Sequence, residues 1–552
     1  MTTITEVADR YLDALAGLDP VAAEAAGRTP QSRFADLSPD GFAARAELAR
    51  TTATAAAGAS TDGTSELALA AALVDRLTSE VALHDSGFTT RLLAPLATPV
   101  HLTRQVFDNL PRVSEADWAD VAAHLRRVPV ALGQYADTLR WSAGRGQVVA
   151  RRQILAVADQ CTAWITVDDF YGRLVSGYPG TGVLAGELTA GARLAASATL
   201  DFAGFLRTEL APQATEVDGV GRDLYAVTAR DFLGAQVDLD ELYAYGWAEL
   251  ERTAAELRAV AAELGHPDVA TARAALDADP AGRVPVGPDL EAWLRDRTAQ
   301  VTDALDGPHF DIPAATRDVV CRLSPAASGV MYYTPPDPGL TRPGGIWWSV
   351  PPGETSVPVW RHVGTLHHEG LPGHHLQHAI TLTTADLHPW QRALCHVHGY
   401  AEGWAHYAER LADEFGLYRG PAERLGMLDG QMWRAARVVI DIGLHLDAPI
   451  PAGTGFTDAR RWTPAVAVDF LVDVAGLDRA TARFEVDRYL GWPAQALAFK
   501  VGARLWQQAR REAEQRDGSA FDRKLFHRTA LRLGPMGLDP LRTRLAALSS
   551  AS

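Results

Sequence analysis

Residues 367–375 read HHEGLPGHH, and this stretch lies in the part of the chain where histidine is most frequent. Ten of the 17 histidines fall between His362 and His406. A single histidine is usually a surface residue or a hydrogen-bonded core residue. A cluster that includes the dipeptide His368–Glu369 is instead typical of a metal site. The stretch therefore indicates a metal centre, around which the rest of the sequence can be interpreted.

The spacing of these histidines differs from that of HExxH enzymes. In those enzymes two ligands lie one helical turn apart, and the glutamate beside the first activates a metal-bound water. Here the residue four positions after His368 is Pro372, which cannot bind a metal. Two arrangements remain open from spacing alone. Pro372 and Gly373 can distort a helix and bring His374 beside His368, or His374 can pair with His378, one turn further on.

A third ligand is expected from the next helix, QRALCHVHGYAEGWAHYAERLADEF at residues 391–415. It carries Glu402 in a stretch of small and aromatic residues that indicates burial. A buried carboxylate needs a partner, and a metal ion provides one. His398 and His406 share the face of Glu402 at one-turn spacing, which places them near the same site.

The rest of the chain predicts a mainly helical protein. Apolar residues recur every three or four positions over 4–18, 66–84 and 115–141, and 238–264 forms another strong helix with Asp238 or Asp240 as its N-cap. Residues 168–182 hold aromatic residues and glycines and predict a turn.

A small β-sheet is expected over about 318–350. DVVCRLSP, SGVMYYTPP and GGIWWSVPP are short β-branched and aromatic runs separated by proline and glycine, so they predict two or three strands. This gives an N-terminal helical region, 1–225, and a catalytic helical region with the small sheet, 226–552.

Composition excludes several classes of function. The chain has 52 basic and 68 acidic residues, for a net charge of −16, which argues against nucleic acid and anionic lipid as partners. No apolar run reaches the roughly 18 residues of a membrane span. The N-terminus lacks the basic start and apolar run of a signal peptide, and the three cysteines are far apart. We expect a cytoplasmic protein without nucleic-acid or membrane partners; its oligomeric state is unknown.

Two motifs resemble a known family. HEGLPGHHLQ (368–377) and EGWAHYAE (402–409) are similar to the HExxPGHHLQ and EGWAxYxE motifs of the bacterial domain-of-unknown-function 885 family. YYTPP (332–336), RVVIDIGLH (437–445) and EVDRYLGWPAQAL (485–497) extend the match. The resemblance implies a fold like that of helical zinc carboxypeptidases and oligopeptidases. Such a fold is mainly α, with two helical halves enclosing a deep cleft and the small sheet next to the metal site.

The same resemblance implies one zinc ion, or another divalent metal, bound by His368, His374 and Glu402. Glu369 would be the general base, and His375 would lie directly behind the ligands.

The chain departs from the family pattern near this site. The family motif PGQAxxYxxG reads PAQALAFKVG here, so Ala494 replaces a glycine and Phe499 a tyrosine. If that tyrosine stabilises the oxyanion, then Tyr489, His445 or Lys500 must replace it. His406 stands where the family usually has an aliphatic residue.

Other polar residues are candidates for substrate contacts. Arg437 or Arg488 can bind a substrate carboxylate through two hydrogen bonds. Tyr332, in the predicted sheet, can line the cleft where an extended substrate pairs with an edge strand.

The sequence thus predicts a zinc-dependent hydrolase that cleaves amide bonds of short peptides. The main alternative is a metalloenzyme of the same fold that acts on a non-peptide amide or an amino-acid-derived metabolite in a biosynthetic pathway. A non-catalytic binding protein is the remaining alternative, and poor metal retention would distinguish it.

Overall fold

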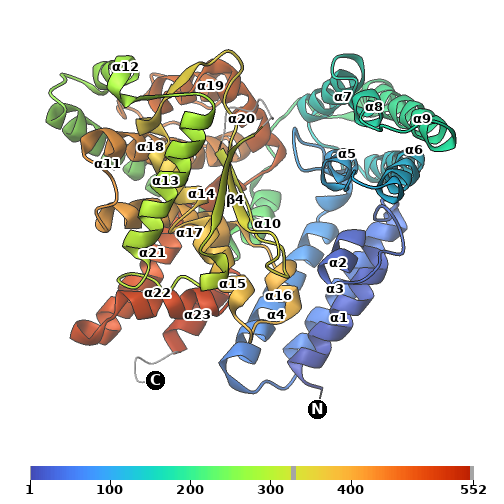
Figure 1. Ribbon diagram of the computed structural model, residues 1–552, viewed down its shortest axis with the longest axis horizontal. Coiled ribbons are helices and arrows are strands. Elements are labelled where there is room, and N and C mark those ends of the chain that lie inside the picture. The colour runs from blue at the N-terminus through green and yellow to red at the C-terminus, as the bar shows by residue number, and fades with distance from the viewer. Residues whose placement is uncertain (1, 325–330, 548–552) are drawn as a thin grey trace.

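The computed structural model describes residues 2–324 and 331–547, and its fold is mainly α, as predicted (Figure 1). The first nine helices are α1 (Ile4–Leu18), α2 (Pro20–Ala25), α3 (Pro39–Ala57), α4 (Gly63–Asp85), α5 (Pro99–Asn109), α6 (Glu115–Ala143), α7 (Arg151–Thr166), α8 (Phe170–Ser176) and α9 (Val183–Phe205).

The helices of the second half begin shortly before the predicted boundary. They are α10 (Arg222–Leu233), α11 (Leu239–Glu263), α12 (Val269–Ala278), α13 (Pro288–Leu305), α14 (Val363–Glu369), α15 (His374–Thr383), α16 (Pro389–Ala393), α17 (His398–Glu414), α18 (Pro421–Leu446), α19 (Pro464–Ala475), α20 (Arg479–Gly491), α21 (Leu497–Asp517), α22 (Arg523–Arg532) and α23 (Leu538–Ala547).

Local sequence explains where several helices begin. α1 starts with a capping box in which Thr3 and Glu6 bond each other's backbone N–H groups, and α11 starts at Asp238, whose carboxylate accepts from two N–H groups of the first turn. Two predictions are wrong in detail. Residues 168–182 contain the short helix α8, and residues 391–415 form two helices, because the chain leaves helical geometry between α16 and α17.

A three-stranded sheet lies in the predicted region, in the order β2 (Val319–Leu323), β4 (Gly344–Trp348), β3 (Met331–Thr334). β4 is parallel to β2 and antiparallel to β3. Ile346 and Trp348 of β4 pack on α13 and α14 in one apolar cluster, which fixes the sheet beside the histidine segment. Residues 325–330, part of two predicted strand segments, lie outside the described residues. A two-stranded sheet of β1 (Arg283–Pro285) and β5 (Ser356–Pro358) was not predicted.

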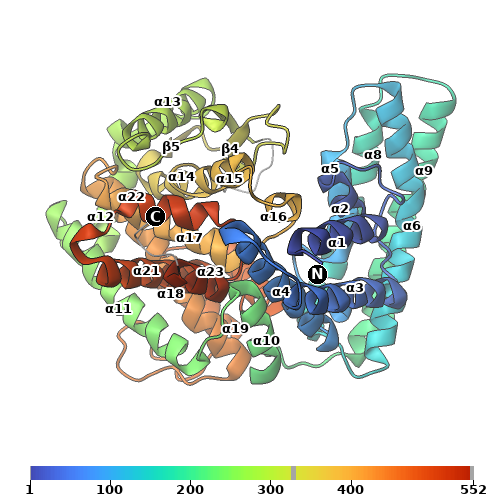
Figure 2. The ribbon, with the colours of Figure 1, turned by 90° about the horizontal axis from the view of Figure 1, so that it is seen from below.

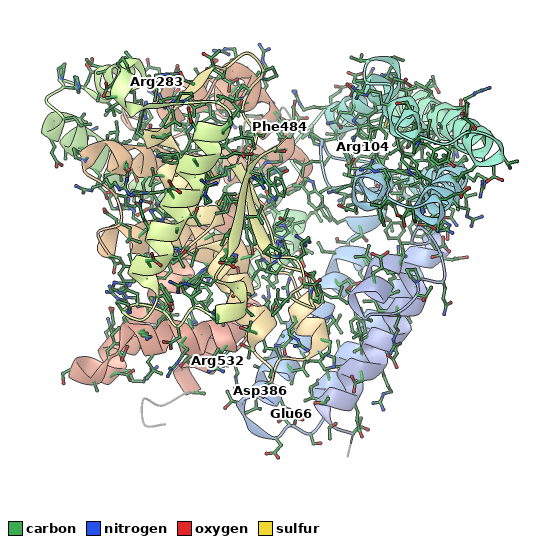
Figure 3. All side chains as sticks on the ribbon, in the orientation of Figure 1. Glu66, Arg104, Arg283, Asp386, Phe484 and Arg532 are labelled. Carbon is green, nitrogen blue, oxygen red and sulfur yellow. The ribbon has the colours of Figure 1, made fainter. Side chains whose placement is uncertain are left out.

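The apolar cores do not follow the predicted division of the chain into regions 1–225 and 226–552, because the N-terminal helices belong to two different cores. Helices α5–α9 share a core of their own and form a lobe at the right of Figures 1 and 2. The side chains of this lobe appear in Figure 3, where Arg104 is labelled. The guanidinium carbon of Arg104 lies 4.6 Å from the ring centre of Phe170.

Helices α1, α3 and α4 instead share a core with α10, α17, α21 and α23, and α4 lies beside α23 in Figure 2. The predicted boundary at 225/226 falls inside α10. No helix in the described part of the chain is both long and apolar enough to span a membrane.

Candidate metal centre

The helix that carries the first histidines breaks where proline and glycine predict a distortion. α14 ends at Glu369 and α15 begins at His374, with a turn between them that contains the cis peptide bond Leu371–Pro372. Gly373 is required here, because a Cβ at this position would lie 2.0 Å from the carbonyl oxygen of His368. The break goes further than the predicted bulge, since the two histidines lie on separate helices.

A tryptophan from α17 holds this turn in place. The indole Nε1 of Trp404, which is fully buried, donates to the carbonyl oxygens of Pro372 (2.9 Å) and Gly373 (3.2 Å). α17 itself packs closely on α21, because Gly403 faces Gly502 across the helix pair and a Cβ on Gly403 would lie 2.6 Å from the Cα of Gly502. The packed helix pair α17 and α21 therefore positions three parts of the site: the turn, Glu402 and Phe499.

Three predicted ligands come together at this place. Oε2 of Glu402 lies 3.2 Å from Nε2 of His368 and 3.6 Å from Nε2 of His374, and the three donor atoms lie within 4.8 Å of one another. Ligand atoms around a tetrahedral zinc ion, with bonds of about 2.0–2.1 Å, are roughly 3.3 Å apart. The donor set and its spacing fit a divalent metal with one open position. His378 lines the same cavity but does not belong to this group of donors.

A second glutamate, which the sequence did not single out, fixes the orientation of the first histidine. Oε1 of Glu409 lies 2.8 Å from Nδ1 of His368, and its Oε2 accepts from Nε2 of Gln431 (2.9 Å). The predicted neighbour His406 contacts Oε2 of Glu409 at 3.2 Å and has no direct contact with the three ligands. The signal was available in EGWAHYAE, because Glu409 is two helical turns beyond Glu402.

Burial and pairing shift the pKa values of the site in opposite directions. Burial alone would lower the pKa of His368, but its hydrogen bonds to Glu402 and Glu409 outweigh this and raise the pKa to about 9. Burial would raise the pKa of Glu402, yet the two histidines hold it well below its usual range. Burial dominates for Glu369 and raises its pKa above the ordinary value. Glu369 therefore holds a proton more readily than a surface carboxylate does.

The site opens into a cavity of about 670 Å³. All the residues that line this cavity belong to the second half of the chain, from Met331 to Phe499 in sequence. The three ligands and Glu369 form part of its wall. Tyr332 of the small sheet lines it, as predicted for a substrate-contacting residue, and so does Arg437. The predicted cleft between the two helical halves stays a prediction.

Arg488 and Tyr489 lie behind Arg437 and not in the cavity wall. The guanidinium groups of Arg437 and Arg488 bond Oε2 of Glu485 at 3.1 and 2.8 Å, and the Tyr489 hydroxyl donates to the same oxygen at 2.7 Å. The hydroxyl of Tyr489 is thus committed to a buried network. Since neither side chain lines the cavity, the role of Tyr489 as oxyanion donor and that of Arg488 as a substrate contact stay predictions.

His445 and Lys500 are also absent from the cavity lining. Both ring nitrogens of His445 bond backbone groups, those of Val220 (3.3 Å) and Tyr489 (3.1 Å). Lys500 is buried and pairs with Glu249 at 2.7 Å. Their catalytic and substrate-binding roles stay predictions, and in this structure their side chains make the buried contacts given above.

Two predicted neighbours of the metal lie further out. Nε2 of His375 bonds the carbonyl of Thr316 (2.7 Å) and its Nδ1 bonds the hydroxyl of Tyr333 (3.0 Å), a residue of the cavity wall. The ring of His398 packs on Phe232, with ring centres 5.0 Å apart. Neither contacts the three ligands directly.

The fold and site define a class of mainly helical proteins in which two histidines and a glutamate form a metal-type donor set in a cavity. The chain belongs to the family described as "Bacterial protein of unknown function (DUF885)", which it matches over residues 20–545. No curated protein matches the chain.

Two solved structures share the fold. The "putative lipoprotein" from Colwellia psychrerythraea is 18% identical, with a TM-score of 0.85 over 99% of both chains. A "putative lipoprotein of unknown function" from Shewanella oneidensis is 17% identical, with a TM-score of 0.73 over 98% of this chain and 99% of the other.

Proposed function

We propose that this protein is a zinc-dependent hydrolase that cleaves amide bonds of short peptides. The observation that carries the proposal is that Glu369 lines the same cavity as the donor atoms of His368, His374 and Glu402. A carboxylate directly after the first ligand, facing the space where substrate would lie, is the arrangement of a general base for hydrolysis.

The residues divide the chemistry between them. A zinc ion bound to the three donors would polarise the scissile carbonyl and acidify a water molecule. Glu369 accepts the proton of the attacking water and passes it to the leaving amine nitrogen. Glu409 forms a hydrogen bond with Nδ1 of His368, and this contact keeps Nε2 of the same ring directed at the place where the metal ion would bind.

A second candidate is hydrolysis of a non-peptide amide or an amino-acid-derived metabolite. Phe499 favours it, because this residue lines the cavity and stacks near His368, with ring centres 6.0 Å apart, where the family pattern has a tyrosine. The cavity wall thus lacks a hydroxyl at the position where the family pattern has a tyrosine.

Peptide turnover by the zinc-loaded protein tests the proposal. We expect cleavage within a panel of dipeptides and tripeptides, and a rate about 10²–10⁴-fold lower for Glu369→Gln with unchanged metal content. Glu414→Gln, on the exposed part of α17, is the matched control and should keep the full rate. No cleavage of any peptide, or full activity of Glu369→Gln, would contradict the proposal. Cleavage confined to non-peptide amides would support the second candidate.

A cytoplasmic location stays a prediction; both solved relatives carry the word lipoprotein in their names.

A further inference from the structure

One wall of the cavity carries a guanidinium group that forms no close ion pair, although its charge acts on the carboxylates of Glu369 and Glu409. Arg434 of α18 lines the cavity and, among the described residues, forms no ion pair. Its Nε is buried without a hydrogen-bond partner. Its guanidinium lies 4.9 Å from the ring centre of Trp433 and 5.7 Å from that of Phe499. Cation–π contacts compensate only part of the lost hydration, so the group is arranged to receive an anion.

The neighbouring arginine adds to this excess of positive charge. Arg437 lies one turn further along α18, and its Nη1 is buried without a partner. Its ion-pair partner is Glu485, whose carboxylate it shares with Arg488. One carboxylate thus serves two guanidinium groups, while Arg434 beside them has no such close partner in the described part of the chain. A negatively charged group of the substrate would complete this wall.

The distance of this wall from the metal centre sets the length of the substrate. The ring of Phe499 lies between the two sites, with its centre 6.0 Å from that of His368, 5.7 Å from the guanidinium carbon of Arg434 and 4.6 Å from that of Arg437. An extended residue spans about 3.5 Å. The ring centre of His368 and the guanidinium carbon of Arg434 are therefore at most about 12 Å apart, so only a few residues bridge from a carbonyl at the metal centre to an anion at the arginines.

We infer that Arg434 binds the α-carboxylate at the C-terminus of the substrate, beside the buried positive charge of Arg437. This inference rests on the proposed hydrolase and makes it a carboxypeptidase-type enzyme that cleaves near the C-terminus of its substrate. A guanidinium fork matches a carboxylate in plane and charge, which gives two parallel hydrogen bonds. Water supplies the oxygen and the proton for the bond that is broken, so the reaction needs no further reactant.

Calorimetry on the full-length, zinc-loaded Glu369→Gln protein tests the inference without turnover. Trialanine should bind at least about tenfold more tightly than trialaninamide, because a charged hydrogen-bonded pair contributes that much to affinity. Arg434→Gln in the same background should remove this preference, and Arg434→Lys should restore part of it. Arg424→Gln, a half-buried arginine of the same helix that does not line the cavity, should leave it unchanged. Equal binding of the two peptides, undetectable binding of both, or a preference that survives Arg434→Gln would overturn the inference.

A third peptide distinguishes the source of the carboxylate. Alanyl-glutamyl-alaninamide, whose only carboxylate is a side chain, should bind like trialaninamide; binding as tight as that of trialanine would overturn the assignment to the α-carboxylate.

Turnover by the protein with Glu369 intact separates this inference from the proposed function. Equal cleavage of acid and amide, unaffected by Arg434→Gln, would uphold the hydrolase and overturn the carboxylate site. Arg434-dependent binding without cleavage would uphold the carboxylate site and overturn the hydrolase.

Discussion

Nδ1 of His368 lies 2.8 Å from Oε1 of Glu409, and both side chains are buried. This contact fixes the plane of the imidazole ring and leaves Nε2 as the atom that faces Glu402. In metal proteins a carboxylate behind a ligating histidine orients the ring and makes it a better ligand. The contact therefore connects the core of α17 to the metal centre.

Replacing Glu409 by glutamine should weaken metal binding about 10–100-fold, because an amide orients and charges the imidazole less well than a carboxylate. Competition with a chelator measures the affinity. Glu414→Gln, five residues further along the same helix and partly exposed, should bind metal like the parent protein. Equal affinities of Glu409→Gln and the parent would show that Glu409 does not act on the metal.

Trp404→Phe should lower both stability and metal affinity. The phenyl ring keeps the apolar packing, but the carbonyls of Pro372 and Gly373 lose their donor, at a cost of about 1–3 kcal/mol. Urea unfolding and chelator competition measure the two effects. Trp506→Phe is the control, since its indole donates to Tyr400 and does not touch the turn. It should lose stability only; a similar loss of metal affinity in both variants would refute the role of Trp404.

Gly373→Ala should prevent the turn between α14 and α15 from forming. The new methyl group would meet the backbone carbonyls of His368 and His367 at 2.0 and 2.4 Å, and backbone cannot move aside as a side chain can. We expect a loss of about 3 kcal/mol or more and loss of bound metal. Gly186→Ala, in open space on α9, should instead gain about 0.5–1 kcal/mol. A stable, metal-bound Gly373→Ala protein would contradict the structure of the turn.

Asp441→Asn should change how stability depends on pH. Burial raises the pKa of Asp441 from 3.8 to about 7, although its carboxylate accepts from Tyr225 and from the backbone N–H of Ala494. A carboxyl group with a raised folded-state pKa contributes its full stability below pH 4 and loses it as the pH rises to about 7. The loss is on the order of 4 kcal/mol.

The asparagine variant lacks this titration, so its stability relative to the parent should increase between pH 4.5 and 8. Urea unfolding at both pH values, with chelator present throughout, measures the difference. Parallel pH profiles of the two proteins would contradict the raised pKa.

Helical periodicity and local capping predicted much of the fold. The apolar spacing of residues 4–18 and the N-cap at Asp238 correspond to α1 and the start of α11. The break between α16 and α17 was not predicted; the segment between the two helices makes a contact distant in sequence, in which the thiol of Cys395 donates to the carbonyl of Pro535. The sheet of β1 and β5 was also missed, since its three-residue strands pair across long sequence separation.

Sequence patterns brought together the three candidate donors and two residues of the cavity wall, Tyr332 and Arg437, but gave the rest of the wall incorrectly. Spacing alone left His374 and His378 both open, and only the turn at Gly373 places His374 beside His368. His445 shares a helix face with Arg437, yet eight residues of helix separate them by about 12 Å. The sequence predicted no role for Arg434, because only the folded structure shows that this arginine lines the cavity without forming a close ion pair.

The metal content of purified single-residue variants tests the central claim most directly. The parent protein and His378→Ala should each hold one zinc ion per chain, while His368→Ala, His374→Ala and Glu402→Ala should lose it. Folding of each variant is checked by circular dichroism. Full occupancy in His374→Ala together with loss in His378→Ala would contradict the ligand set proposed for this protein.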